Sequence, residues 1–222
     1  MSLQIIHLRK ILKIMYLQGP QRVSSLRADI RDDIKRESGE DRSSGGDFYG
    51  PFWRDAKDHV FGVTDLREQT AVRIESNGGR AKLYRQLCDG FLVWWNERRR
   101  WTNEPFQPAD TKKTVCRLPG LDANIKFANI LSVRDSRNED RLVYPYWFPN
   151  PPLNEESARL GLWALTQAFP EVDLTQFRIL DVIRGQTYSL ERNPFRGDEA
   201  KLFRRRHASV LAEWRTLRQE YD

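Results

Sequence analysis

Residues 141–183, RLVYPYWFPNPPLNEESARLGLWALTQAFPEVDLTQFRILDVI, decide the fold, because they predict a strand, a helix and a second strand in succession. The two strands are expected at 141–148 and 177–183, where Ile, Val and aromatic residues favour extended structure. Between them, Asn154 can cap a helix over 155–169, whose apolar residues recur at helical spacing. This stretch therefore predicts a helix packed against a sheet.

Further strands and helices extend from this stretch in both directions. Thr114–Leu118 and Ile125–Val133 predict earlier strands, and Thr187–Leu190 predicts a short later one. A last helix is expected over 198–221, because its apolar residues alternate at spacings of three and four. Helical patterns dominate the chain before residue 104. We therefore predict an α+β protein with a helical N-terminal half, followed by a small mixed sheet flanked by helices.

A polar, glycine-rich segment, SGEDRSSGGD, divides the chain, because it offers no apolar side chain to a core. The expected organisation is a helical hairpin arm (1–37), a linker (38–47) and an α+β domain (48–222) with a helical lead-in (48–104) and a sheet core (112–222).

The arm is expected to hold helices over 3–17 and 23–37, separated by Gly19-Pro20. An apolar helix pair ahead of a linker predicts assembly with a protein partner or with a second copy of the chain. Half of a DNA-reading helix-turn-helix is the alternative interpretation of the same pair.

The composition excludes several classes of protein. The chain has 222 residues, of which 39% are hydrophobic and 31% charged, and its mean hydropathy is −0.69. It lacks the roughly 20 consecutive apolar residues of a membrane span, so no membrane partner is expected. Arg9, Lys10 and Lys13 interrupt the first apolar run, which argues against a signal peptide and for a cytoplasmic location. Cys88 and Cys116 are too few for a four-cysteine zinc site; no metal or other cofactor is expected, and a disulfide between them stays open.

Arginine dominates the basic residues: 28 of the 37 Lys and Arg side chains are Arg, and the net charge is +6. Arg binds phosphate through two parallel hydrogen bonds and stacks on aromatic rings, which favours DNA or RNA as a partner. GC-rich codon usage is the alternative explanation. The expected nucleic-acid contacts are Arg98, Arg99, Arg100 and Trp101 at the end of one helix, and Lys201, Arg204 and Arg205 at the start of another. We expect the second group to face solvent. If both groups project from the same side of the sheet, they form a basic groove for a phosphate backbone; the alternative is that each is a solvated helix face on opposite sides of the molecule.

Tyr146, Trp147 and Phe148 are consecutive aromatic residues, followed by a proline-rich segment. They predict a partner-docking surface or a platform on which bases stack. The alternative interpretation is that these rings fill the core between the sheet and a helix.

The sequence contains no complete catalytic motif, and the candidates for catalysis are Asp55, Asp58 and His59. Their spacing places Asp55 and His59 on one face of a helix, where they could act as an acid–base pair or bind a metal. Together with Asp135 or Asp181 from the sheet, they would form a rearranged metal site. A hydrogen bond between an Asp and a His on a helix surface is the alternative.

The order of elements after residue 114, with the hairpin in Ile125–Phe148, the segment Ala158–Leu165 and the strand Arg178–Val182, resembles the PD-(D/E)XK nucleases in their RecB- and Cas4-like branch. The resemblance implies a restriction-endonuclease-like core and a nucleic-acid context. In that family, an Asp on one strand and an acidic residue two positions before a Lys on the next hold the divalent cation for phosphodiester hydrolysis.

The catalytic residues of that family have no counterparts here. Asn129 stands near the Asp position, Tyr144 or Pro145 at the acidic position, and Trp147 at the Lys position. The family's helical Gln-x-x-x-Tyr would begin at Arg159, so that signature is also missing.

The sequence therefore predicts a non-catalytic protein with a degenerate nuclease-like core that binds nucleic acid or a protein. Two alternatives are a metal-dependent nuclease that uses Mg²⁺ at a rearranged site, and a subunit of a larger complex assembled through the N-terminal helices.

Overall fold

The computed structural model describes residues 5–39, 48–99, 103–121 and 123–221, within which seven α-helices and two sheets form. The helices are α1 (Leu8–Tyr16), α2 (Gly19–Glu37), α3 (Gly50–Val60), α4 (Leu66–Ser76), α5 (Ala81–Val93), α6 (Glu155–Ala168) and α7 (Glu199–Arg218), with the short helical turns η1 (Gly78–Arg80), η2 (Trp94–Arg98) and η3 (Leu174–Gln176). The strands are β1 (Ile5–His7), β2 (Gln107–Pro108), β3 (Thr114–Arg117), β4 (Asn124–Phe127), β5 (Leu131–Arg134), β6 (Asp140–Tyr146), β7 (Phe177–Asp181) and β8 (Gln186–Tyr188).

The strand–helix–strand unit predicted from residues 141–183 forms the centre of the larger sheet. Its strand order is β2-β5-β6-β7-β8, with β5 antiparallel to β6, and β7 parallel to β6 after the crossover through α6. Asn154 caps α6 as expected, since its side chain accepts a hydrogen bond from Ser157 N at 2.8 Å. The predicted α+β fold, with a mixed sheet flanked by helices, is confirmed.

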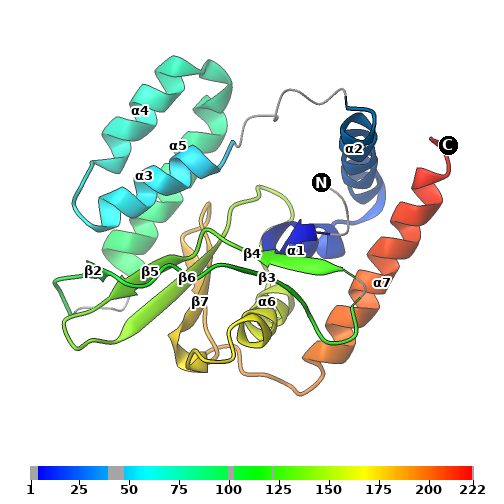
Figure 1. Cartoon of the computed structure of the whole chain (residues 1–222). Helices are drawn as coiled ribbons and strands as arrows, with labels where there is room; N and C mark the ends of the chain where they lie inside the picture. The colour runs from blue at the N-terminus through cyan, green and yellow to red at the C-terminus, as the bar shows by residue number, and fades with distance from the viewer. Residues whose placement is uncertain (1–4, 40–47, 100–102, 122, 222) are drawn as a thin grey trace.

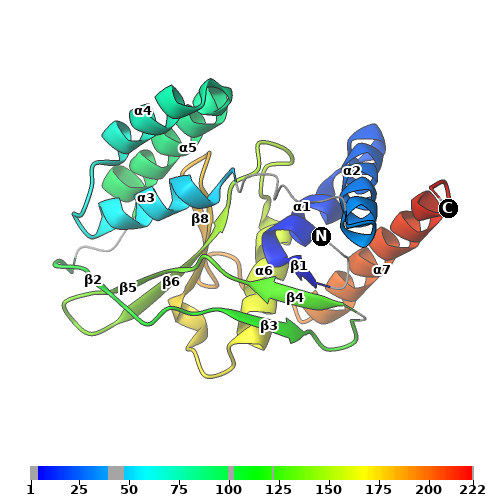
Figure 2. The same cartoon turned by 45° about the horizontal axis from the view of Figure 1, so that its top comes forward.

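Alternating side chains of β6 and β7 build two hydrophobic cores, one on each face of the larger sheet. Leu142 and Ile179 point toward α6 and α1, whereas Val143 and Leu180 point toward α3 and α5. Figures 1 and 2 show the same layers, with α3, α4 and α5 over one face of the sheet and α6 against the other. The sheet is therefore buried on both faces.

The expected strand over Ile125–Val133 is divided between two sheets. β4 pairs with β1 and β3 in the smaller sheet, whereas β5 pairs with β2 and β6 in the larger one. Asn129 lies between them with φ of 67°, in the left-handed region that an extended strand does not use. This single backbone conformation turns the chain from one sheet to the other.

The prediction of a separate N-terminal arm is wrong for the described residues 5–37. Ile5–His7 is a strand parallel to β4, and the first helix starts at Leu8 rather than at residue 3. Leu8 and Ile11 are fully buried in the core shared with α6 and β4, so α1 has no apolar face left for a partner. Of the expected linker, only residues 38 and 39 lie within the described ranges.

Helix α2 packs along α7, as Figure 1 shows at the right of the molecule. Ile30 of α2 and Val210 of α7 are buried in the same core. Ion pairs join α2 to α7 at Arg22 and Glu213 (2.6 Å), and to the residues that follow α7 at Arg27 and Glu220 (2.7 Å). Along α2, the surface predicted for assembly is thus occupied by the chain's own last helix.

None of the described helices is both long and apolar enough to cross a bilayer. Cys88 and Cys116 are free thiols, which answers the open question of a disulfide.

Candidate functional site

An arginine-lined cleft lies beside β8, where η2 approaches the larger sheet. We call it the arginine cleft, and within the described residues its arginines are Arg98, Arg99, Arg141, Arg178 and Arg192. Arg98 and Arg99 come from the end of η2, Arg141 from β6, Arg178 from β7 and Arg192 from the loop after β8. Its volume is about 220 Å³, and Trp94, Thr187, Ser189 and Glu191 complete the lining.

Two glycines let the walls of the arginine cleft approach closely. A Cβ atom at Gly90 of α5 would overlap the carbonyl oxygens of Val182 and Ile183, and one at Gly185 would lie 2.5 Å from Gly90 O. Gly185 also has φ of 57°, a conformation that favours glycine. Arg98 connects η2 to the turn between β7 and β8, because its Nη1 donates hydrogen bonds to Arg184 O (2.9 Å) and Gly185 O (3.3 Å).

Two arginines of the arginine cleft have close acidic partners, since Arg99 pairs with Glu104 at 2.5 Å and Arg141 pairs with Glu139, whereas Arg178 is only weakly neutralised. The Arg178 side chain is 13% exposed, and its ion-pair partner Glu191 is 3.9 Å away and 69% exposed. Burial lowers the pKa of Arg178 from its usual value, Glu191 offsets part of that change, and Arg141 and Arg192 lower the pKa further. These guanidinium groups therefore repel one another, and a bound anion would relieve the repulsion.

Two guanidinium nitrogens in the lining have unused hydrogen-bonding capacity. Arg99 Nη1 and Arg141 Nε are buried and have no hydrogen-bond partner within the described part of the chain. Arg99 is otherwise held firmly, because its guanidinium stacks on Trp95 at 3.9 Å and on Phe106 at 4.7 Å. Unpaired buried donors are costly, and these two nitrogens lie beneath the surface of the cleft.

The two predicted basic patches do not meet in the arginine cleft. Arg98 and Arg99 belong to it, whereas Arg100 and Trp101 lie outside the described residues. Lys201, Arg204 and Arg205 are exposed on α7, as expected. Arg204, however, packs against Gly120 in the turn between β3 and β4, beside the smaller sheet. The cleft at Arg98 and Arg99 is built from η2, β6, β7, β8 and the loop after β8, without the α7 group.

Sequence reasoning missed Arg141, Arg178 and Arg192, because no local pattern relates them. The strand register brings them together: Val143 pairs with Arg178, which sets Arg141 and Arg178 on neighbouring strands of the sheet. The sequence does show a basic residue near the start of each of these two strands. That pattern predicts a shared basic site only when the pairing of the strands is known.

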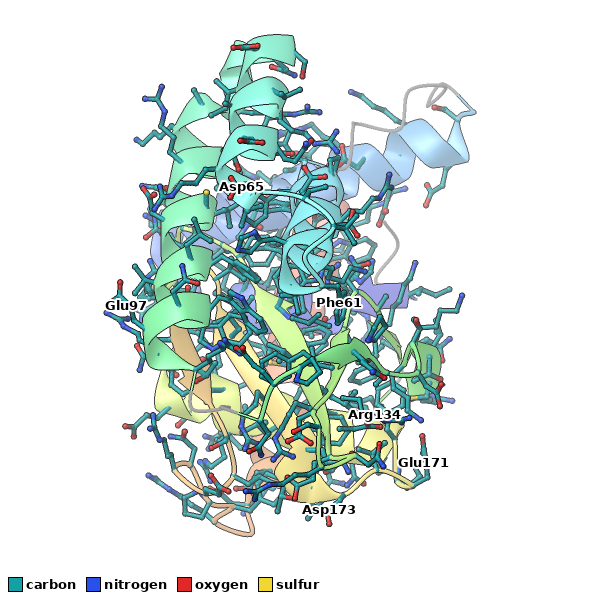
Figure 3. All side chains as sticks on the ribbon, turned by 90° about the vertical axis from the view of Figure 1, so that its left-hand side faces the viewer. Phe61, Asp65, Glu97, Arg134, Glu171 and Asp173 are labelled. Atoms are coloured by element: carbon teal, nitrogen blue, oxygen red, sulfur yellow. The ribbon has the colours of Figure 1, made fainter. Side chains whose placement is uncertain are left out.

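The catalytic candidates Asp55, Asp58 and His59 do not form a site with the sheet. Asp55 accepts two hydrogen bonds from Arg73, at 2.7 and 2.9 Å, and His59 Nδ1 accepts one from Leu66 N at 3.3 Å. Both are local contacts among α3, α4 and their connection. Figure 3 shows Asp65, which caps the start of α4, in this helical layer and well away from Asp173 beside the sheet.

The sheet carboxylates are also engaged elsewhere. Asp181 is fully buried and accepts from Leu153 N at 3.1 Å, and Arg184 forms an ion pair with it at 3.1 Å. Asp135 accepts from the backbone N–H groups of Arg137 and Glu139 in the β5–β6 turn. Throughout the described ranges, no three His, Cys, Asp or Glu side chains group to hold a metal ion. The rearranged metal site is therefore wrong for these residues.

A buried arginine occupies the region where the nuclease resemblance places metal ligands. Arg9 is 6% exposed, and its guanidinium lies 4.1 Å from the ring centre of Trp147 and donates to Ala128 O at 3.2 Å. The backbone N–H of Arg9 donates to Tyr144 Oη, and Trp53 Nε1 donates to Asn129 O. A fixed positive charge at this point opposes the binding of a divalent cation.

The aromatic segment predicted to dock a partner lies in the core instead. Tyr146 and Trp147 are 1% and 3% exposed, and Phe148 is half-buried between both hydrophobic cores. Trp147 stacks on Tyr49 with 5.1 Å between ring centres. These rings join the sheet to the helices on either side, so the core-filling interpretation is the correct one.

Comparison with known proteins adds no identity: the sequence matches no protein-family model and no curated protein.

Proposed function

We propose that the protein binds nucleic acid through phosphate contacts in the arginine cleft and does not cleave it. The observation that carries the proposal is the convergence of Arg98, Arg99, Arg141, Arg178 and Arg192 from four separate segments of the described chain. Arg forms paired hydrogen bonds with phosphate oxygens, and such contacts supply most of the sequence-independent affinity for nucleic acids.

The order of elements supports a degenerate nuclease-like core as the framework for this binding. The antiparallel β5–β6 hairpin, the helix α6 and the parallel strand β7 follow one another as that resemblance implies. The proposed loss of cleavage rests on Arg9, which stands where a metal-binding nuclease needs carboxylates.

Fluorescence anisotropy with labelled DNA and RNA at low salt tests the binding. We expect affinity that depends weakly on sequence and falls steeply as salt rises, because phosphate contacts release counterions. The variant Arg192→Glu should weaken binding about tenfold, which corresponds to about 1.4 kcal/mol, and should lower the salt slope by about one. Arg192 suits this test because its side chain is exposed and has no hydrogen bond or ion pair within the described ranges.

Arg205→Glu is the matched control, because it makes the same charge change at an exposed position of α7 outside the arginine cleft. Equal weakening by both variants would show that only net charge matters and would overturn the site. Absence of binding to any nucleic acid at low salt, or equal binding of polyglutamate, would overturn the function.

A cleavage assay with Mg²⁺ or Mn²⁺ tests the second half of the proposal. We expect intact substrate after long incubation. Metal-dependent cleavage that disappears in Asn129→Ala would instead establish a working nuclease.

A further inference from the structure

A second cavity adjoins the arginine cleft and shares Arg192 with it. Its volume is about 500 Å³, and its lining includes Asn154, Glu155, Asn193 and Phe195. We propose that this cavity, which we call the base pocket, receives an unpaired nucleobase, so that the ligand of the protein is single-stranded nucleic acid. This inference rests on the proposed function and specifies its ligand.

The lining of the base pocket combines an aromatic ring with polar groups that suit the edge of a base. Phe195 is partly buried against the core and supplies the aromatic surface. Asn193 offers both donor and acceptor groups, and Glu155 is an exposed acceptor in the first turn of α6. Stacking on an aromatic ring with hydrogen bonds to the base edge is the usual way in which proteins hold unpaired bases.

The remaining charged side chains of the base pocket are committed to the fold. Arg159 forms ion pairs with Asp198 (2.9 Å) and Glu199 (2.6 Å), while Tyr16 Oη donates to Glu156 at 2.7 Å and Arg206 also pairs with Glu156. These groups form the walls of the pocket. The charges left for a ligand are therefore those of Glu155, Arg192 and Arg196.

The loop that carries Phe195 is held in place before any ligand binds. Glu199 accepts hydrogen bonds from Arg196 N at 2.6 Å and from Gly197 N at 3.0 Å. At the other side of the pocket, Asn154 and Ser157 form a reciprocal capping box at the start of α6. A preformed pocket loses less free energy on binding than one that must be ordered.

The volume and position of the base pocket favour an unpaired base over a duplex as its occupant. The arginine cleft, at about 220 Å³, is smaller than the roughly 300 Å³ at which ligand pockets usually begin, whereas the base pocket, at about 500 Å³, lies within the usual range. A paired base would have to leave its stack to enter the pocket, which costs a few kcal/mol. A strand with free bases can place a phosphate beside Arg192 and the neighbouring base against Phe195 without that cost.

The test compares three probes of equal length on the full chain: a single strand, the corresponding duplex, and a single strand with abasic sites. The abasic strand keeps every phosphate and loses the bases. We expect the single strand to bind about tenfold tighter than either of the other probes, in line with the stacking of one base. Equal affinity for the single strand and the abasic strand would overturn the inference.

Phe195→Ala should remove the preference for bases, lowering affinity for the single strand about tenfold and leaving affinity for the abasic strand unchanged. Phe61→Ala is the matched control, because Phe61 is also partly buried but follows the end of α3, in the helical layer on the other face of the larger sheet (Figure 3). Thermal melting checks that both variants fold; if Phe195→Ala does not, the abasic comparison on the unaltered chain decides alone.

The two proposals fail in different ways. If no probe binds, the proposed function fails. If all three probes bind equally and Arg192→Glu weakens each of them, the function stands and the base pocket is wrong.

Discussion

At the scale of single residues, the buried contact between Arg9 and Trp147 is structural. The guanidinium of Arg9 lies over the Trp147 ring, while the other contacts of Trp147 are with Tyr49 and with Trp53, whose ring centre is 6.0 Å away. These side chains hold the sheet to α1 and α3, and their contribution is expected in stability rather than in activity.

Trp147→Ala should therefore lower the free energy of unfolding by about 3–5 kcal/mol, as is typical for removing a large buried aromatic side chain. Urea denaturation followed by circular dichroism measures the change. Val72→Ala, at an exposed position of α4, is the control and should change stability by less than about 0.5 kcal/mol. An unchanged unfolding midpoint for Trp147→Ala would restore the docking interpretation.

Asp33 of α2 predicts a specific dependence of stability on pH. Burial raises the pKa of its carboxyl to about 6; Lys10 and Arg218 lower the pKa, and Glu37 and Asp32 raise it. The folded state therefore holds a proton that the unfolded state has released at the same pH. The free energy of unfolding therefore decreases as the pH rises from about 4 to about 6, because unfolding then releases that proton.

Asp33→Asn removes that titration while keeping a group that forms hydrogen bonds. We expect the variant to melt at a higher temperature than the unaltered chain above pH 6, and at a similar temperature near pH 4. Melting curves at intervals of one pH unit measure the difference. A difference that stays constant over this range would show that Asp33 does not titrate there.

At the scale of secondary-structure elements, local patterns predict what local contacts determine. The helix over 155–169 was predictable because its cap at Asn154 and its apolar spacing lie within the segment itself. The division of 125–133 between two sheets was not, because a left-handed Asn129 is required by strand pairing rather than by its neighbours in sequence. The arginine cleft was half predictable: Arg98 and Arg99 are adjacent in sequence, whereas Arg141 and Arg178 meet only through the sheet.

The contact between α5 and the β7–β8 turn is the element-scale feature that a mutation can test. Gly90→Ala would place a methyl group against backbone carbonyl oxygens that cannot rotate away. We expect destabilisation of about 1–3 kcal/mol or more, together with weaker binding of nucleic acid because the walls of the arginine cleft separate.

Gly78→Ala is the control, since a Cβ atom at Gly78 would meet no heavy atom within 4 Å. Its melting temperature and affinity should stay close to those of the unaltered chain. If Gly90→Ala behaves in the same way, the close approach of the two walls has no consequence for the arginine cleft.

At the scale of the whole molecule, the first and last helices are far apart in sequence but pack in the same hydrophobic core. Figure 2 shows β1 beside β4, with α1 and α2 between the sheet region and α7. The core on this side includes Leu8, Ile11 and Leu12 from α1 and Leu217 from the end of α7. Segments more than 200 residues apart therefore fold as one unit.

Removing residues 1–37 should abolish cooperative folding. Each fully buried aliphatic side chain contributes about 1.5–3 kcal/mol, and the loss of Leu8, Ile11, Leu12 and Ile14 approaches the 5–15 kcal/mol that stabilises a typical domain. Near-ultraviolet circular dichroism measures the outcome. Removal of the last four residues, which costs the surface pair of Arg27 with Glu220, is the control and should be tolerated. A shortened chain 38–222 that melts cooperatively would support the separate arm after all.

Trp94 gives the arginine cleft an optical property. Its indole is buried in the lining, 5.3 Å from the ring centre of Phe91 and 5.7 Å from that of Trp95. Indole emission responds to the charges around it, and an anion arriving among the guanidinium groups changes those charges. Occupancy of the cleft can therefore be followed as a change in the protein's own fluorescence, without an attached dye.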